Sequence, residues 1–378
     1  MTSDISERIQ RLAARRRGTD RMAALESVDQ IEVLAKSLVE EDGWAKRARS
    51  QPFTRYTLGA MQEVGPDYTK VSLETAQRVR GQLDARLHAS GFLVEFYVQG
   101  SVPANVHIRG VSDVDLLVLD RSFLTFDRRG LISTHGGYTN PSVLSTETVL
   151  TRLRSSAERS LEAAFPRASI DKTGAKAISI SKGSLARPVD VVPSHWHDTI
   201  DYQHSRQIDD RGVTLWDREV RRSIENMPFR HIAKLGAQDL VTGGGLKKAI
   251  RLCKNVKADA IEDGKRIAFS SFDIAVAMYH ASSSALGAGI AYELAILGET
   301  QRHLDRLATD SSYARSLWTP DGTRKIFDNE DKLAGLRSLS IELDALAKAV
   351  AREQNHALLS RPAPTWQEIT EVLAQSYV

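Results

Sequence analysis

Residues 93–119 constrain the fold of this chain more than any other stretch. Leu93–Val98 is an apolar run rich in aromatic and β-branched residues, which is typical of a β-strand, and Gly100 and Ser101 follow it as a turn. A polar, basic loop then leads to a second apolar run that starts at Val114. Two strand-like runs connected in this way indicate the start of a β-sheet.

Two aspartates mark the beginning of the second run. Asp113 and Asp115 alternate with Val114, so in a strand both carboxylates lie on one face and repel each other. A divalent cation relieves this repulsion, and Mg²⁺ and Mn²⁺ prefer oxygen ligands, with substrate phosphates completing the shell. A Gly-Ser pair alone is only a strand-end turn. Ahead of these carboxylates, the backbone at Gly100 and the hydroxyl of Ser101 predict a phosphate contact.

A third carboxylate stands among valines in the run Arg187–Pro193. A lone aspartate such as Asp190 is seldom buried unless it is paired or bound to a metal. One interpretation is a strand-end ion pair with Arg187. The other is a neighbouring strand that places Asp190 beside Asp113 and Asp115, where three carboxylates hold two Mg²⁺ ions for phosphoryl transfer.

The rest of the chain is mainly helical by its apolar periodicity. A helix that starts at Ser72 and ends at Gly91 leads directly into the first strand. We therefore expect an α+β fold of two lobes, divided into an N-terminal helical extension (1–60), a catalytic core (61–220) and a helical C-terminal subdomain (221–378). Further expected helices are 5–48, 145–164, 246–257, 267–279, 290–310, 329–355 and 365–377, with short strands at 168–171 and 177–181 and an edge strand at 212–216.

Composition narrows the setting of the protein. The chain of 378 residues has 51 Lys and Arg against 48 Asp and Glu, which does not predict bulk nucleic-acid binding but permits a local basic cleft. Its single cysteine, Cys253, excludes an intramolecular disulfide and a multi-cysteine zinc site, so we expect a cytoplasmic protein. No apolar run is long enough for a membrane span, and the N-terminus has no signal-peptide core.

Three basic or polar clusters have competing interpretations. Lys247, Arg251 and Lys254 share one helix flank, which either neutralises a triphosphate or is a solvated face. The run Arg15–Arg17 is interpreted as a solvated face rather than a nucleic-acid contact. Ser194–Asp198 contains two histidines and a tryptophan, and packing is favoured over zinc binding because no cysteine is near.

With these residues in place, the chain resembles the DNA polymerase β-like nucleotidyltransferase superfamily. More narrowly, it resembles the bacterial cGAS/DncV-like nucleotidyltransferases (CD-NTases) and, through them, oligoadenylate synthase. The sequences Gln99-Gly-Ser-Val-Pro and His107-Ile-Arg-Gly-Val-Ser-Asp-Val-Asp-Leu-Leu are specific to that group. The positions that match the superfamily signature are Gly100, Ser101, Asp113, Asp115 and Asp190.

The resemblance implies a fold and further site residues. A mixed sheet flanked by helices would form a polymerase β-like core, followed by an all-helical oligoadenylate synthase-like subdomain. Arg251-Leu-Cys-Lys254 resembles a helix whose lysine contacts the donor triphosphate, and we include Lys247 in this nucleotide-binding group. Ser271 and Phe272 stand where a Ser-Tyr pair contacts phosphate and stacks on a base. Phenylalanine keeps the stacking surface and loses the hydroxyl.

The activity implied by the resemblance is synthesis of a cyclic di- or trinucleotide second messenger from NTPs, ATP among them, in CBASS anti-phage defence. Asp113, Asp115 and Asp190 would hold two Mg²⁺ ions, for which Mn²⁺ can substitute. A downstream effector would bind the product rather than the enzyme, and a CBASS regulatory protein is an implied partner. Double-stranded DNA sensing is not expected, because the zinc loop of the animal sensor needs several cysteines.

Other functions fit the same residues. A template-independent nucleotidyltransferase that modifies RNA or protein uses the same acidic triad. A non-catalytic nucleotide-binding protein could retain the fold, although all three carboxylates are intact. A metal-dependent phosphohydrolase also uses clustered aspartates but would need His-Asp pairs at other spacings. Base choice, ring size, linkage and activation are left open by the sequence.

Overall fold

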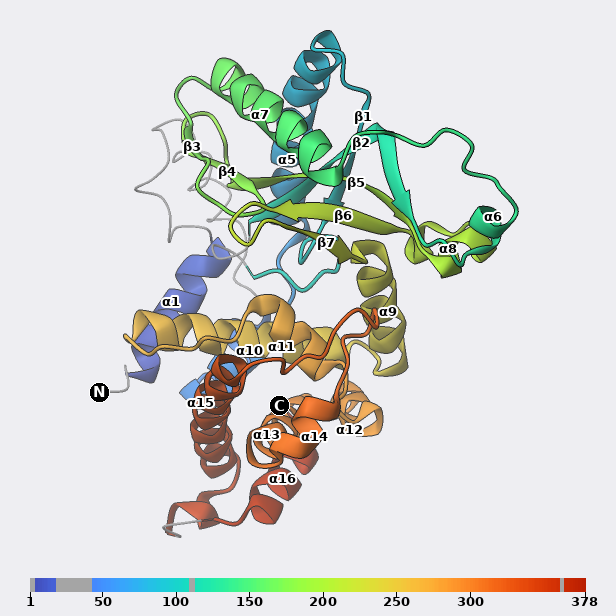
Figure 1. Cartoon of the computed structure of the whole chain (residues 1–378). Helices are drawn as coiled ribbons and strands as arrows, with labels where there is room; N and C mark the ends of the chain where they lie inside the picture. The colour runs from blue at the N-terminus through green and yellow to red at the C-terminus, as the bar shows by residue number, and fades with distance from the viewer. Residues whose placement is uncertain (1–3, 18–42, 109–112, 361–363) are drawn as a thin grey trace.

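A computed structural model describes residues 4–17, 43–108, 113–360 and 364–378 of the chain. In these residues one mixed sheet forms the upper lobe in Figure 1, with the order β1-β2-β5-β4-β3, and β6 pairs with both β5 and β7. β2 and β5 are parallel, and the other pairs are antiparallel. The strands are β1 (Val94–Gln99), β2 (Val114–Phe126), β3 (Ser169–Asp171), β4 (Ile178–Ser181), β5 (Val189–Asp198), β6 (Gly212–Asp217) and β7 (Arg222–Asn226).

Two helices cover one face of the sheet. α5 (Pro66–Ala89) and α7 (Thr146–Ala164) pack against each other and against the central strands (Figure 1). Alternate residues of β2, including Leu116 and Val118, are buried beneath them, whereas Leu117 and Leu119 belong to a smaller cluster on the opposite face. That opposite face lies toward the second lobe.

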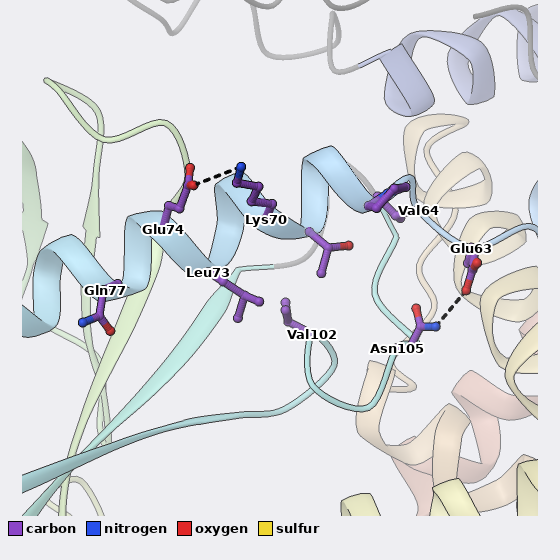
Figure 2. A pocket seen from close by; sticks show the side chains of 10 residues that line it. Glu63, Val64, Lys70, Leu73, Glu74, Gln77, Val102 and Asn105 are labelled. Carbon is purple, nitrogen blue, oxygen red and sulfur yellow. Dashed lines mark hydrogen bonds and ion pairs between the residues drawn. The ribbon is translucent and has the colours of Figure 1, made fainter.

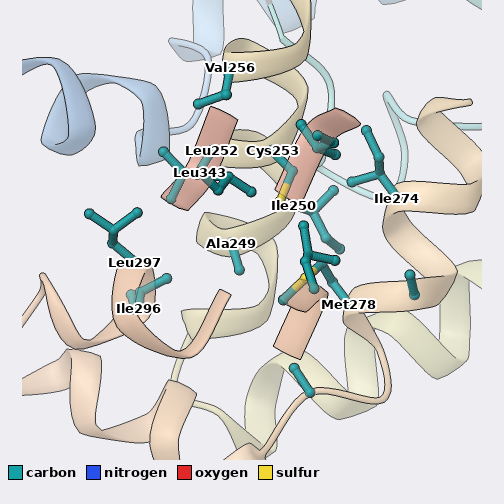
Figure 3. Close-up of a cluster of buried hydrophobic side chains, with 14 of the residues drawn as sticks. Ala249, Ile250, Leu252, Cys253, Val256, Ile274, Met278, Ile296, Leu297 and Leu343 are labelled. Atoms are coloured by element: carbon teal, nitrogen blue, oxygen red, sulfur yellow. The ribbon is translucent and has the colours of Figure 1, made fainter. Parts of the chain in front are cut away.

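The second lobe is helical and is built around α10 (Gly245–Glu262). Its buried face packs against helices from the C-terminal third of the chain, as Figure 3 shows for Ile250, Cys253 and Leu343. The other helices are α1 (Ile5–Arg17), α3 (Gly43–Lys46), α4 (Pro52–Met61), α6 (Leu131–Thr134), α8 (Ile200–Ser205), α9 (Pro228–Val241), α11 (Ser271–Met278), α12 (Ser283–Gly287), α13 (Ala295–Thr309), α14 (Ser311–Ser316), α15 (Glu330–Gln354) and α16 (Trp366–Gln375), with 3-10 turns at Ile208–Asp210, Ala288–Ile290 and His356–Ser360.

The N-terminal helix α1 joins the helical lobe through both apolar and charged contacts. Leu12 is buried in the same core as α4 and α10, and α1 lies beside α10 in Figure 1. Arg15 is only 2% exposed and pairs with Asp259 at 2.8 Å. The interpretation of Arg15 as part of a solvated face is therefore wrong, because its partner lies far away in the sequence.

The structure differs from the sequence-based prediction at several helix and strand boundaries. α5 begins at Pro66 rather than Ser72, β2 extends through Phe126 into the stretch expected to be a loop, and β6 is flanked on both sides instead of being an edge. The helices near 146, 330 and 366 are confirmed, and each has a side-chain N-cap, supplied by Ser145, Asn329 and Thr365. The expected helical stretch at 18–42 lies outside the described residues, and the division at residues 60 and 220 stays a prediction.

Candidate active site

The three predicted aspartates lie at the same end of β2 and β5. Asp115 is directly opposite Asp190 in the parallel strand pair. Asp115 alternates with Leu116 and is on the same side of the sheet as Leu117, away from α5 and α7. Asp113 precedes β2 by one residue, and its charge acts on Asp115. The structure thus brings together carboxylates that are 75 positions apart by the strand register.

Gly100 is required beside these carboxylates for steric reasons. β1 places Gln99 opposite Asp115, and the chain then turns at Gly100 with a φ of +80°. This left-handed conformation is strained for residues with a side chain. A Cβ at Gly100 would also overlap Oδ2 of Asp115. The turn therefore brings backbone, rather than a side chain, up to the carboxylate.

The electrostatics of the group fit a cation. Burial, followed by the charges of Asp190 and Asp113, raises the pKa of Asp115 to about 7, and Lys254 offsets part of this rise. A bound cation would remove the repulsion and favour the ionised carboxylate. Among the described residues, no three His, Cys, Asp or Glu side chains are drawn together into a metal-ligand group, so the three carboxylates would have to close around an ion. Their chemistry suits Mg²⁺ or Mn²⁺.

The loop after Gly100 folds into a closed turn. Ser101 O accepts a hydrogen bond from Val106 N at 3.0 Å, and Val102 O accepts one from Asn105 N at 3.0 Å. Lys254 of α10 reaches this turn from the helical lobe, and its Nζ donates to Val106 O at 2.7 Å. Lys254 is 4% exposed, and burial, followed by the charge of Lys257, lowers its pKa to about 7. Ser101 and Lys254, predicted separately, therefore meet at this turn: Ser101 belongs to it, and Lys254 of α10 contacts it.

The basic flank of α10 is divided among different partners. Arg251 donates to the carbonyl groups of Met61 and Asn105. Lys247 is not brought to the carboxylates, because its Nζ lies 3.6 Å from Oδ2 of Asp239 on α9. Of the three predicted basic residues, only Lys254 contributes to the electrostatics of Asp115.

Two residues that interact electrostatically with Lys254 were missed. Lys257, one turn beyond Lys254, donates to Phe269 O at 2.6 Å and acts on the charge of Lys254. Its spacing of three residues from Lys254 was the available signal. His107 is 1% exposed and its Nε2 lies 3.0 Å from Thr69 Oγ1. Burial, followed by the charges of Lys254 and Arg251, lowers its pKa to about 4, so His107 is neutral near pH 7.

Ser271 and Phe272 begin α11. The N-cap is Ser270, which accepts a hydrogen bond from Asp273 N at 3.0 Å, and Ser271 is exposed. The ring of Phe272 lies 4.8 Å from the ring of His231, and the Arg324 guanidinium is 5.1 Å from it. Phe272 is thus already in contact with two side chains. Asp273, the next residue, acts through its charge on Lys257 of α10.

The histidines of Ser194–Asp198 are packing residues. His195 is fully buried, its Nε2 lies 3.1 Å from Thr146 Oγ1, and its ring packs edge-on against Phe123. Trp196 is buried in the cluster with Leu117.

A separate cavity lies on the other side of the Ser101–Val106 turn. It has a volume of about 670 Å³ and is formed by α5 together with Val102 and Asn105 (Figure 2). None of the predicted site residues lines it. No helix in the described parts of the chain is both long and apolar enough to cross a bilayer.

Comparisons with known proteins identify relatives of this chain. Residues 233–342 match the cGAS/DncV-like nucleotidyltransferase C-terminal helical domain. A cyclic dinucleotide synthase, CdnE, from Yersinia aleksiciae is 40% identical over 358 residues, covering 92% of each protein. A c-di-GMP synthase from Capnocytophaga granulosa is 33% identical over 76% of this chain and 85% of its own length.

The fold is shared with solved structures. The STING-associated CdnE c-di-GMP synthase from Capnocytophaga granulosa superposes with a TM-score of 0.67 and 26% identity, over 91% of this chain and 97% of that one. This agreement covers both lobes of the α+β architecture. The identity and coverage of these relatives show that the chain belongs to the bacterial cGAS/DncV-like nucleotidyltransferases.

Proposed function

We propose that this protein synthesises a cyclic dinucleotide from NTPs, with release of pyrophosphate. The observation that carries the proposal is the pairing of Asp115 with Asp190 across parallel strands, beside the Gly100 turn and Lys254. The names of the curated relatives favour a dinucleotide over a trinucleotide product. ATP is a proposed substrate.

The residues divide into two roles. Asp113, Asp115 and Asp190 would hold two Mg²⁺ ions, which when bound would neutralise the triphosphate and lower the pKa of the attacking hydroxyl. The backbone at Gly100, the hydroxyl of Ser101 and the ammonium of Lys254 would hold the donor triphosphate. Lys254 would exchange its hydrogen bond to Val106 O for a phosphate oxygen.

Two phosphoryl transfers complete the reaction. In the first, a ribose hydroxyl of one NTP attacks the α-phosphorus of the other, loses its proton, and pyrophosphate leaves. In the second, a hydroxyl at the other end of the linear product loses its proton and attacks the remaining α-phosphorus, a second pyrophosphate leaves, and the ring closes. Asp113, Asp115 and Asp190 would have to be ionised during turnover, because the ionised carboxylates would hold the two Mg²⁺ ions.

The cellular role follows as part of the same proposal. The product would be a second messenger in CBASS anti-phage defence, read by a downstream effector that binds the nucleotide rather than the enzyme. A cytoplasmic location, where NTPs are abundant, and control by a CBASS regulatory protein belong to this proposal. Of the side chains predicted to bind nucleotide, Ser271 and Phe272 remain proposed contacts at the start of α11.

The test is a product assay. The purified protein is incubated with ATP, GTP, CTP and UTP, singly and in pairs, with Mg²⁺ or Mn²⁺, treated with phosphatase, and analysed by mass spectrometry. We expect a phosphatase-resistant cyclic dinucleotide with the wild type and none with an Asp113→Asn, Asp115→Asn double variant. Labelled protein or lengthened RNA without any cyclic product would contradict the proposal and favour the alternative nucleotidyltransferase. Equal yields from both proteins would show that these carboxylates are not the catalytic ones.

A further inference from the structure

Helix α10 holds the turn after Gly100 through a buried arginine. Arg251 is 5% exposed, its Nε donates to Met61 O at 2.9 Å, and its Nη1 donates to Asn105 O at 2.8 Å. Met61 is the last residue of α4, so its carbonyl has no partner within that helix. One guanidinium therefore joins the end of α4, the turn that follows β1, and α10.

The partners of Arg251 are backbone groups rather than acids. No carboxylate of the described residues lies within ion-pair distance of Arg251. Burial of an arginine without an ion pair is unfavourable, and here burial lowers its pKa to about 10. The N–H groups of a guanidinium are spread over a rigid planar fork and can serve two separate carbonyls in fixed directions, whereas the three donors of a lysine share one nitrogen. The arrangement suits a residue selected for the geometry that it imposes.

Asn105 is fixed from several directions. Its backbone adopts a φ of +53°, its N–H closes the turn on Val102 O, and its side chain donates to Glu63 Oε2 at 2.8 Å (Figure 2). On α10, one turn beyond Arg251, Asn255 donates to Ala60 O of α4 at 3.0 Å. The turn and α4 are thus bound to the same face of α10, and Arg251 is the side chain that contacts both.

The same turn carries Ser101. Ser101 O accepts from Val106 N, so a displacement of Asn105 and Val106 would be transmitted to Ser101 and, through Gly100, to the position facing Asp115. A shift of about 1 Å in a positioning group can lower a rate by roughly 100-fold. The sequence predicted that Arg251 contacts nucleotide. In the structure, its Nε and Nη1 already donate to Met61 O and Asn105 O.

We propose that Arg251 is a positioning residue that holds the Ser101–Val106 turn at the carboxylates, and not a ligand of the triphosphate. The part of this inference that concerns turnover rests on the proposed function. The part that concerns the turn does not, because it can be measured in the enzyme without nucleotide.

Hydrogen exchange of the nucleotide-free protein tests the structural part. In Arg251→Met, we expect the amides of residues 101–108 to exchange roughly tenfold faster than in the wild type. Lys248→Met is the matched control, since it removes a cation from the same helix that pairs with Glu293, away from the turn. Unchanged exchange at 101–108 in folded Arg251→Met would overturn the proposal.

Kinetics test the functional part. Arg251→Met is expected to lower kcat by roughly 10- to 100-fold with KM for NTP changed less than about threefold. Arg251→Lys should behave like Arg251→Met, because it keeps the charge and loses the fork. The loss should be non-additive with Ser101→Ala, since both act through one turn. A raised KM, rescue by lysine and additive losses would identify Arg251 as a direct nucleotide contact.

A second variant covers a failure of Arg251→Met to fold. Arg251→Lys keeps the buried cation but loses the planar fork that joins Met61 O to Asn105 O. It should increase exchange of the same amides, and unchanged exchange at 101–108 in the folded variant would contradict the proposal. If the wild type yields no cyclic product, the proposed function fails, whereas the exchange result still decides whether Arg251 holds the turn.

Discussion

Two groups of carboxylates in this protein are neutralised to very different extents. In the helical lobe, Asp259, Asp263 and Glu342 meet arginines of α1 in ion pairs such as Arg8–Asp263 at 2.7 Å and Arg15–Asp259 at 2.8 Å. At the sheet, no described arginine or lysine forms an ion pair with Asp115 or Asp190.

The difference between the two groups shows what each is for. In the helical lobe the compensating cations are part of the chain, so the charges fasten α1 onto α10. At the strand ends the compensation is incomplete, and the pKa of Asp115 rises to about 7. A group whose charge is left unbalanced by the chain is one that a ligand can complete.

The largest difference between the two groups should appear when a charge is removed at the strand ends. Asp115→Asn and Asp190→Asn should each lower cyclic product formation by roughly 1,000-fold, because each removes a proposed metal ligand. Thermal stability without metal should stay the same or increase, since a repulsive charge is lost. Product yield and melting temperature measure both. A variant that melts at a lower temperature but keeps its specific activity while folded would show that these carboxylates support the fold.

The same change in the helical lobe should have the opposite outcome. Asp259→Asn leaves Arg15 buried without its carboxylate and weakens the bond from Tyr56, so the free energy of unfolding should fall by about 3–5 kcal/mol. Turnover well below the melting temperature should stay close to that of the wild type. Urea denaturation followed by circular dichroism gives the stability. An inactive variant with unchanged stability would place Asp259 in the active site.

A smaller effect on product formation is expected from adding a side chain at Gly100, whose backbone lies against the carboxylate of Asp115. Gly100→Ala introduces a Cβ that overlaps Asp115 Oδ2 and strains a positive φ, so product formation should fall by roughly 100-fold. Gly91→Ala is the control, because Gly91 also has a positive φ but a Cβ there would meet no other atom within 4 Å. Equal losses in the two variants would assign the effect to backbone strain alone.

The smallest expected effect is a pH dependence of stability in metal-free buffer. The folded pKa of Asp115, about 7, lies above the unfolded value of about 4, so the native state binds this proton more tightly. The stabilisation is complete below pH 4 and is lost as pH rises through 7, whereas Asp115→Asn should show no such loss. Parallel denaturation curves for wild type and variant from pH 4 to 8 would contradict this. Added Mg²⁺ should stabilise only the wild type at pH 8.

Local patterns predicted some elements well. Val114–Leu119 alternates inward and outward, and the structure separates its odd and even residues onto two faces. Ser145, Asn329 and Thr365 cap helices whose starts were predicted within one or two residues. These signals are local, because they depend on the spacing of side chains along one element.

Predictions that depended on a distant partner fared less well. Arg15 in a basic run was assigned to solvent, yet it is buried against Asp259. Lys247 has the same helical spacing as Arg251 and Lys254, yet it pairs with Asp239 on α9. Lys247, Arg251 and Lys254 have separate roles because α9, α4 and the turn place different partners beside them. The spacing of residues along α10 does not encode these partners.

By itself, the sequence determined the carboxylates, the glycine between strand and turn, and the helices that follow, because each is set by residue type and short-range spacing. Only the tertiary structure decided that Asp190 faces Asp115, that Arg251 serves two carbonyls, and that α1 neutralises the far end of α10. Strand register and burial act between residues far apart in the chain, so these choices appear only once the two lobes have packed together.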